Sequence, residues 1–172
     1  MNQQFGTSYS KSAVFDEVAD YISGFVRIGS IDNSRPWGGF FVVEEDDADK
    51  FIEQFFPHLN KEVLSISGKL SPKILLVEPG KKLSWQYHHR RAEIWKLIAG
   101  RAGVIKSEDD HEKEVILLEP GDLVELQQGE RHRLIGLDQW GIIAEIWRHT
   151  DAENPSDEDD IIRLQDDFGR KS

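Results

Sequence analysis

Residues 76–100, LVEPGKKLSWQYHHRRAEIWKLIAG, and residues 117–132, LLEPGDLVELQQGERH, decide the fold. Both begin with two apolar residues followed by Glu-Pro-Gly, which is typical of a strand that ends in a tight turn. Five residues then separate the glycine from a glutamine in each stretch, Gln86 in the first and Gln127 in the second. The repeated phrase therefore predicts two related hairpin units.

Short apolar runs separated by turn residues continue around these two units. The runs are KILLV (73–77), EIWKLI (93–98), EVILL (114–118), LVEL (123–126) and GIIAEIW (141–147), and the breaks are EPGKK (78–82), AGRAG (99–103), EPGD (119–122) and QQGE (127–130). Such a rhythm is typical of a small antiparallel barrel or sandwich.

The first third of the chain has a mixed pattern. Apolar residues at helical spacing predict a helix over 13–25, and a second helix over 46–56, which Pro57 ends. Between them, residues 40–43 read as a strand. We expect one mainly β domain, in which residues 1–60 form a helical and strand extension, 61–150 the barrel core, and 151–172 a segment that docks on it. An acidic, Pro-broken run such as DAENPSDEDD (151–160) is otherwise typical of a solvated linker.

Composition limits the class of protein. The 172 residues suffice for one domain with a core but are few for two. The chain has no cysteine, which excludes disulfides, thiol nucleophiles and thiolate metal sites, so that any metal ion needs nitrogen and oxygen ligands. The start, MNQQFGTSYS, resembles no leader, and no run approaches the ~20 apolar residues of a membrane span. We expect a cytoplasmic protein that does not enter a membrane.

The formal net charge of −11 argues against nucleic acid as a partner, because binding to a phosphate backbone depends on Lys and Arg. The same charge would repel a small anionic substrate unless basic residues gather locally. The positions of the arginines therefore matter for any substrate assignment.

The polar residues of the two hairpin units resemble the motifs of the cupin family. Gln86, His88 and Glu93 follow the first Pro-Gly turn, and His132 follows the second. In cupins the first motif supplies His, His and Glu and the second supplies the last His, all directed into a barrel where they hold a metal. The resemblance implies a cupin-type antiparallel β-barrel (jelly roll) with one divalent ion on these residues. Gln86 stands where the commonest pattern has histidine.

The donor set is chemically sensible for a metal ion. Two imidazoles, a carboxylate and an amide carbonyl suit a borderline divalent ion and leave positions open for water or substrate. Zinc is the first choice, with iron, manganese, nickel and cobalt as alternatives. Gln86 and His88 share strand parity, so both side chains leave the same face.

Longer segments are similar to the C-terminal cupin domain of type II mannose-6-phosphate isomerases, found alone or fused to a sugar-nucleotide pyrophosphorylase. The segments are RPWGGF (35–40), LSWQYHHRRAEIW (83–95), GERHRL (129–134) and EDDIIRLQDDFGR (158–170). That family has the same Gln-x-His opening, but it typically has histidine at the positions of Arg90 and Ile94. The resemblance implies a metal-dependent sugar-phosphate isomerase that interconverts an aldose and a ketose through an enediolate.

Such a reaction needs a base near the substrate carbon. Glu145 is the first candidate, although the strand parity is ambiguous because both alternating sets around it contain apolar residues. Glu145 could equally orient a ligand or pair with an arginine. Lys73 is a weaker candidate, since a lysine at the start of a strand is usually solvated.

A sugar phosphate needs a cationic handle. The candidates for substrate binding are Arg133, which follows the last ligand histidine, Arg163, Arg170 and Ser84, which shares the parity of Gln86. Ser84 could equally cap a turn. We expect Arg90 and Arg91 to form surface ion pairs, His89 to point outward, and His58, His111 and His149 to lie on the surface.

Two other functions are compatible with these motifs. A non-catalytic carbohydrate-binding cupin is favoured by the replacements at Arg90 and Ile94, and an Fe(II) oxygenase by the set of two histidines and one carboxylate. Cupins commonly pair, so we expect a homodimer in which residues 1–45 could cover a partner.

Overall fold

The computed structural model describes residues 5–60, 64 and 68–171. The helices are α1 (Lys11–Ile22) and α2 (Ala48–Phe55), and a 3-10 turn, η1 (Glu45–Asp47), precedes α2. The strands are β1 (Ile28–Asp32), β2 (Gly38–Val43), β3 (Lys73–Val77), β4 (Trp85–Tyr87), β5 (Arg91–Ser107), β6 (Ile116–Leu118), β7 (Leu123–Leu126), β8 (Arg131–His149) and β9 (Ile162–Gln165). The expected mainly β fold is confirmed.

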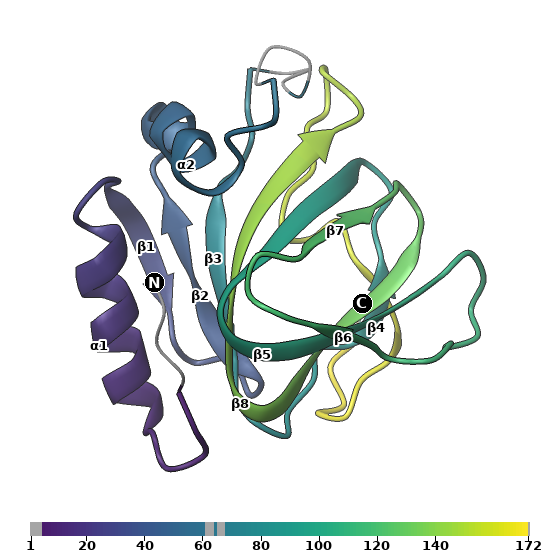
Figure 1. Cartoon of the computed structure of the whole chain (residues 1–172). Helices are drawn as coiled ribbons and strands as arrows, with labels where there is room; N and C mark the ends of the chain where they lie inside the picture. Colours follow the sequence, from purple (N-terminus) through teal and green to yellow (C-terminus); the bar gives the residue numbers. More distant parts are fainter. Residues whose placement is uncertain (1–4, 61–63, 65–67, 172) are drawn as a thin grey trace.

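The strands form one curled antiparallel sheet built around the two long strands β5 and β8 (Figure 1). These strands pair from Arg91 opposite His149 to Ser107 opposite Arg131. β8 also pairs with β3 and β4, and β5 also pairs with β6 and β7. β1 and β2 extend the sheet beyond β3, and β9 joins it beside β4. Segments from both ends of the chain therefore belong to the same sheet.

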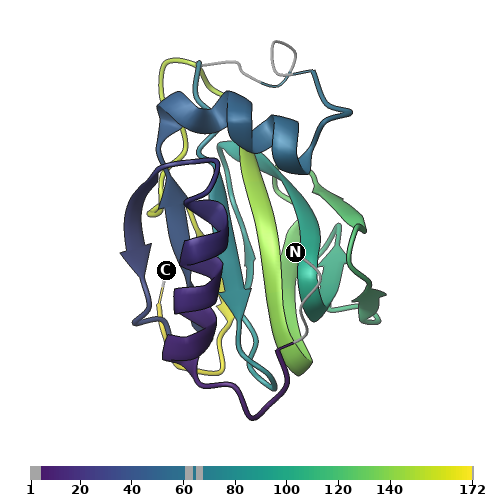
Figure 2. The ribbon, with the colours of Figure 1, turned by 60° about the vertical axis from the view of Figure 1, so that its left-hand side comes forward.

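Both helices cover one face of this sheet (Figure 2). α1 begins where the Ser10 hydroxyl accepts a hydrogen bond from the backbone N–H of Ala13, at 3.2 Å. Apolar side chains of both helices pack in an outer core against the sheet, with Phe51 and Val14 fully buried. A second, inner core fills the concave side of the sheet. No helix in the described ranges is long and apolar enough to cross a membrane.

β8 is buried on both faces, which explains why its parity was ambiguous in the sequence. Ile142, Ala144 and Ile146 belong to the outer core under the helices, while Ile143 belongs to the inner core. Glu145 therefore shares the inner face with Ile143, because side chains alternate along a strand.

The predicted break at AGRAG (99–103) is wrong. β5 runs through this segment and stays paired with β8, with register shifts on both sides of Gly100. Gly100 has φ +73°, and a Cβ there would lie 1.7 Å from the Trp140 carbonyl oxygen. The glycine thus serves a bulge rather than a turn. The predicted Pro-Gly turns are confirmed, with φ +74° at Gly80 and +100° at Gly121.

Candidate metal centre

Three buried side chains from the two hairpin units converge inside the sheet. His88 directly follows β4, Glu93 lies on β5 and His132 lies on β8. Their candidate ligand atoms all lie within 4.8 Å of one another, and each residue is at most 3% exposed. The sequence spacing that predicted this convergence works because β4, β5 and β8 are adjacent in the curled sheet.

The tautomers of the two histidines are set by backbone carbonyls. His88 Nδ1 lies 2.7 Å from the Asp160 carbonyl oxygen, and His132 Nδ1 lies 2.9 Å from that of Glu130. A carbonyl oxygen can only accept, so both Nδ1 atoms carry a proton, and in the neutral rings that bind a metal ion both Nε2 atoms carry a lone pair. Those lone pairs face Glu93, at 3.1 Å from His88 Nε2 and 3.7 Å from His132 Nε2.

These residues fit a divalent metal ion. His132 Nε2 is buried and has no hydrogen-bond partner among the described residues, which is costly for a polar atom unless something else binds there. Outer-sphere carbonyls that hold Nδ1–H are the usual support for a metal-binding histidine. Although burial alone would raise the pKa of Glu93, His88 and Arg91 hold that pKa well below its ordinary value, so the carboxylate is ionised.

Gln86 lies beside this cluster. It stands directly opposite His132 in the pairing of β4 with β8, so both side chains project from the same face. Its Oε1 atom accepts a hydrogen bond from the Ser84 hydroxyl at 2.5 Å, and Ser84 is 1% exposed. A carbonyl oxygen has two lone pairs, so this hydrogen bond leaves one lone pair of Gln86 Oε1 free to bind a metal ion. The role of Gln86 as a fourth ligand stays a prediction.

Arg91 belongs to the centre, so its expected place in a surface ion pair is wrong. It is 6% exposed and donates from Nε to Glu93 Oε1 at 2.9 Å, while Nη2 lies 3.3 Å from His88 Nε2. Its guanidinium carbon lies 3.6 Å from the centroid of a Trp147 ring. Arg90 is more exposed and lies 3.6 Å from Asp157.

Two indole groups hold Glu145 next to Glu93. Trp147 Nε1 donates to Glu145 Oε1 at 2.9 Å, and Trp95 Nε1 donates to Glu145 Oε2 at 2.7 Å and to Glu93 Oε2 at 3.0 Å. Glu145 is 4% exposed, and burial followed by the charge of Glu93 raises its pKa to about 8. Glu145 is therefore an inward-facing carboxyl group with both oxygens fixed.

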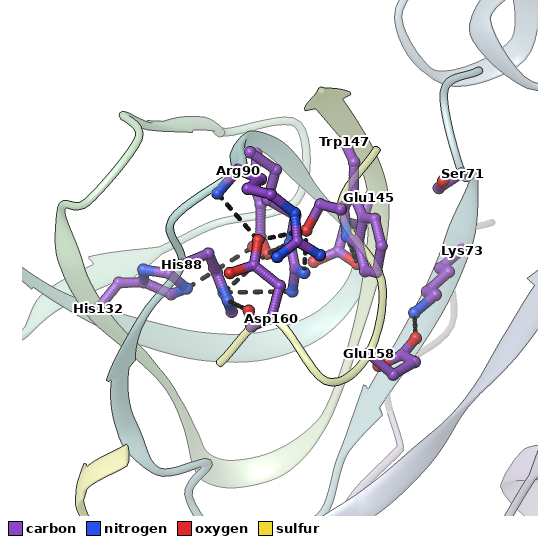
Figure 3. Close-up of polar contacts among 12 residues, drawn as sticks. Ser71, Lys73, His88, Arg90, His132, Glu145, Trp147, Glu158 and Asp160 are labelled. Atoms are coloured by element: carbon purple, nitrogen blue, oxygen red, sulfur yellow. Dashed lines mark hydrogen bonds and ion pairs between the residues drawn. The ribbon is translucent and has the colours of Figure 1, made fainter. Parts of the chain in front are cut away.

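Lys73 is buried rather than solvated, contrary to the expectation for a strand start. It is 5% exposed and stands opposite Glu145 in the pairing of β3 with β8. Its ammonium lies 4.8 Å from the centroid of the Phe40 ring and 4.2 Å from that of a Trp147 ring. Burial is the chief cause that lowers its pKa to about 8. Glu158, which is half exposed, forms an ion pair with it (Figure 3).

A cavity of about 90 Å³ opens beside the cluster. Its polar lining consists of Arg35, Lys73, Gln86, Arg91, Glu93, Glu145, Glu158, Arg163 and Arg170, and its aromatic lining of Trp37, Phe40, Trp95 and Trp147. Arg163 donates to the Lys171 carbonyl and Arg170 pairs with Asp166. The predictions that Arg163 and Arg170 bind substrate are untested.

Arg133 and Ser84 lie outside this lining. Arg133 is 1% exposed, and its guanidinium donates to the Leu83 carbonyl, to Glu112 at 2.9 Å and to Gln165 at 2.6 Å. Its predicted contact with substrate stays a prediction.

The acidic segment after β8 closes over the centre instead of forming a solvated linker. Ser156 and Asp160 are 2% and 4% exposed. Ser156 Oγ and the Asp157 carbonyl accept hydrogen bonds from Arg91, both at 2.9 Å. In Figure 3 this segment lies next to His88 and Arg90. The composition of the segment gives no sign of this role, because five of its six acidic residues are exposed and only Asp160 is buried.

His149 is fully buried, so its expected surface position is wrong, whereas His58, His89 and His111 are exposed. The backbone N–H of Ser156 donates to His149 Nδ1 at 3.0 Å, so Nε2 carries the proton of the neutral ring. Nε2 therefore donates to the Ser71 hydroxyl, 3.0 Å away. A histidine in this tautomer cannot take a proton from Ser71, which excludes the pair as an activated nucleophile.

A curled antiparallel sheet with an inward His-Glu-His cluster defines a cupin-type protein with a candidate metal site. More narrowly, the chain belongs to the family described as Mannose-6-phosphate isomerase C-terminal, whose model matches residues 44–166. The recognition made from the motifs is thereby confirmed.

Curated relatives include a xanthan biosynthesis protein and a mannose-1-phosphate guanylyltransferase. The chain is 32% identical to xanthan biosynthesis protein XanB of Xanthomonas campestris pv. campestris over 137 residues, which covers 79% of this chain and 23% of that protein. It is 32% identical to mannose-1-phosphate guanylyltransferase ManC of Salmonella typhimurium, covering 75% and 26%. The chain thus spans about a quarter of the length of these relatives.

Solved structures support the jelly-roll fold at low sequence identity. Oxalate decarboxylase of Lactobacillus farciminis matches with a TM-score of 0.53 and 18% identity over 78% of this chain and 33% of that one. The capsular polysaccharide assembling protein CapF of Staphylococcus aureus matches with a TM-score of 0.53 and 13% identity, over 79% and 34%. At these identities the likeness shows the fold alone.

Proposed function

We propose that this chain is a metal-dependent isomerase that interconverts aldose and ketose sugar phosphates through an enediolate. The observation that carries the proposal is that the buried Glu145 carboxyl and the Lys73 ammonium line the same cavity as Glu93 of the His-Glu-His cluster. Membership in the mannose-6-phosphate isomerase C-terminal family supports it.

The metal ion would be held by Gln86, His88, Glu93 and His132, with zinc as the first choice and iron, manganese, nickel or cobalt as alternatives. When bound, the ion supplies Lewis acidity that stabilises negative charge on substrate oxygens. The support for this assignment is the burial of the donor atoms and the orientation of both Nε2 lone pairs toward Glu93.

Glu145 is the proposed base. It would take the proton from C2 of an aldose and return it to C1, while the proton of the C2 hydroxyl moves to the C1 oxygen, so that the substrate is isomerised with no net change in protons. The two indole donors fix the positions of its oxygens at the wall of the cavity. Lys73, opposite Glu145, would donate a hydrogen bond to the oxygen that becomes negative in the enediolate.

The phosphate would bind among the cations of the cavity. Arg35, Lys73, Arg91, Arg163 and Arg170 line it, although the chain as a whole has a formal net charge of −11. Such a local excess of positive charge favours an anionic ligand. We assign Arg163 and Arg170 to phosphate, and we place Ser84 and Arg133 in support, where they hold Gln86 and the Leu83 carbonyl.

The position of Ile94 bears on the alternative of a non-catalytic carbohydrate-binding cupin. Ile94 belongs to the outer core, so its side chain points away from the metal cluster. A histidine there would not contact a substrate in the cavity. The absence of the family's usual histidine at this position is therefore compatible with catalysis.

The test is proton exchange at C2. Protein loaded with each candidate metal is incubated with a panel of hexose and heptose phosphates in D2O and followed by NMR. We expect loss of the C2 proton signal and formation of the isomer for at least one sugar. Glu145→Gln should retain metal and slow exchange by about 10²–10⁴-fold, whereas the exposed Glu125→Gln should match the wild type. Metal-loaded protein that changes no sugar in the panel would contradict the proposal.

A further inference from the structure

Asp160 is a buried residue outside the barrel strands, and both oxygens of its carboxylate bond the turn that carries His88. Its Oδ1 accepts from the backbone N–H of His89 and its Oδ2 from that of Arg90, both at 2.9 Å. The Ser156 hydroxyl donates to Oδ2 at 2.6 Å. Three donors thus satisfy a carboxylate that is 4% exposed, as burial of a charge requires.

The backbone of the same residue bonds the ring of His88. The Asp160 carbonyl oxygen accepts from His88 Nδ1 at 2.7 Å. Asp160 therefore accepts hydrogen bonds from three successive residues of the turn. The donors are the ring of His88 and the backbone amides of His89 and Arg90. The two carboxylate bonds and the carbonyl bond thus join the same two segments of the chain.

The neighbouring residues extend this support to Arg91. The Ser156 hydroxyl accepts from Arg91 Nη1 at 2.9 Å while it donates to Asp160, and the Asp157 carbonyl accepts from the same nitrogen at 2.9 Å. Arg91 in turn donates to Glu93. The segment 156–160 thus supports the candidate ligands His88 and Glu93 by separate routes.

We propose that Asp160 is a positioning residue of the metal centre, which fixes the Nδ1–H tautomer of His88 and thereby presents the Nε2 lone pair to the ion. This inference rests on the proposed metal site and extends it to a residue 72 positions away from His88 in the chain. The acidic segment is then part of the centre, and its removal would cost metal affinity.

The first experiment measures zinc affinity by competition with a chelator. We expect Asp160→Asn to bind zinc about 10–100-fold more weakly than the wild type, which is typical for loss of an outer-sphere partner. Asn keeps the shape of the side chain but presents an N–H group to one of the two amides. Asp159→Asn is the matched control, because Asp159 is the exposed neighbour and loses the same charge. An affinity of Asp160→Asn within twofold of the wild type would overturn the proposal.

The second experiment reads the tautomer without metal, from the ¹⁵N chemical shifts of the His88 ring. We expect an Nδ1–H tautomer in the metal-free wild type and in Asp159→Asn, and a mixture of tautomers in folded Asp160→Asn. A merely structural role for Asp160 would lower the melting temperature without changing these shifts. An Nε2–H tautomer in the wild type would refute the assignment, whatever the isomerase assay reports.

A third variant covers the case in which Asp160→Asn does not fold. Ser156→Ala removes one donor to Asp160 and one acceptor of Arg91 but keeps both amide bonds. We expect it to fold, to bind zinc more weakly than the wild type, and to show partial loss of the Nδ1–H tautomer. Wild-type affinity together with an unchanged tautomer would count against Asp160. Because neither readout uses a sugar, a failed isomerase assay would leave this inference standing.

Discussion

Arg91 supplies the positive charge that the buried Glu93 carboxylate needs in the metal-free protein. Its Nε donates to Glu93 Oε1, and its Nη2 approaches the same His88 nitrogen that a metal ion would use. A divalent ion and the guanidinium therefore stabilise the same carboxylate. The ion and the guanidinium partly replace one another, so the loss of Arg91 should increase the stabilisation that a bound ion gives.

We expect Arg91→Gln to lower the free energy of unfolding of the metal-free protein by about 3–5 kcal/mol, because one partner of a buried ion pair is removed. Zinc should then raise the melting temperature of this variant more than that of the wild type. Calorimetry with and without zinc measures both values. Arg90→Gln is the control, since Arg90 is partly exposed and pairs with an exposed aspartate. An equal or smaller zinc effect in Arg91→Gln would contradict the prediction.

His149 should make the protein less stable as the pH falls. Burial is the first cause that lowers its pKa to about 4, from an ordinary value of 6.5. Between these values the unfolded chain binds a proton that the folded chain does not, so stability falls by up to about 1.4 kcal/mol per pH unit. Above pH 6.5 the ring is neutral in both states and contributes no slope.

Urea unfolding at pH 7, 6 and 5 measures this slope. We expect the stability of His149→Gln to fall less steeply with decreasing pH than that of the wild type. The difference in slope should reach at most the contribution of one proton, and it does not depend on how stable the variant is at pH 7. His111→Gln should keep the wild-type slope, because that side chain is 91% exposed. Parallel slopes for the wild type and His149→Gln would show that His149 does not titrate differently on folding.

At the scale of single residues, the sequence predicts those side chains that lie within the two hairpin units. His88, Glu93 and His132 converge because regular strand pairing links their positions. The contacts of Asp160 and the burial of Arg91 depend instead on how a segment 65 or more residues away packs. No local pattern encodes such a contact, which is why both were missed.

At the scale of the strand, the long β5 depends on the bulge at Gly100. The positive φ and the contact with the Trp140 carbonyl leave no space for a Cβ. Gly80 has nearly the same φ, +74°, but a Cβ there would meet nothing within 4 Å. The two glycines therefore separate the cost of backbone conformation from the cost of a steric clash.

We expect Gly80→Ala to lower the free energy of unfolding by about 1–2 kcal/mol, which is the usual cost of a left-handed conformation for a residue with a Cβ. Gly100→Ala should cost clearly more, because the β5–β8 pairing must also shift. Urea unfolding measures both variants, and a Gly100→Ala protein too unstable to purify agrees with the prediction. Equal losses of free energy in the two variants would show that β5 and β8 shift to accommodate the Cβ at position 100 at no measurable cost.

Helices and strands were predictable where the apolar residues follow a single helical or strand spacing. α2 and the short strand β3 follow the apolar patterns closely, whereas β5 crosses a Gly-rich segment that resembles a turn. A glycine that permits a close approach and a glycine that ends a strand are the same letter in a sequence. The pairing with β8 decides between them, and that pairing is not local.

At the scale of the whole molecule, the inner core and the metal centre join parts of the chain that are far apart in sequence. The three clustered residues come from β5, β8 and the end of β4, and the C-terminal segment closes over them. A ligand that bridges these parts binds the folded chain and not the unfolded one. Metal binding should therefore stabilise the whole fold rather than one strand.

Zinc at 100 times its dissociation constant should stabilise the fold by about 2.7 kcal/mol, which for a domain of this size corresponds to a rise in melting temperature of about 5–11 °C. Calorimetry of chelator-treated protein before and after addition of zinc measures the rise. His132→Ala should show no comparable rise relative to its own metal-free form, because it lacks a ligand, while the exposed His111→Ala should keep the full effect. If His132→Ala gains as much as the wild type, zinc binds elsewhere on a surface rich in acidic residues, and the cluster is not its site.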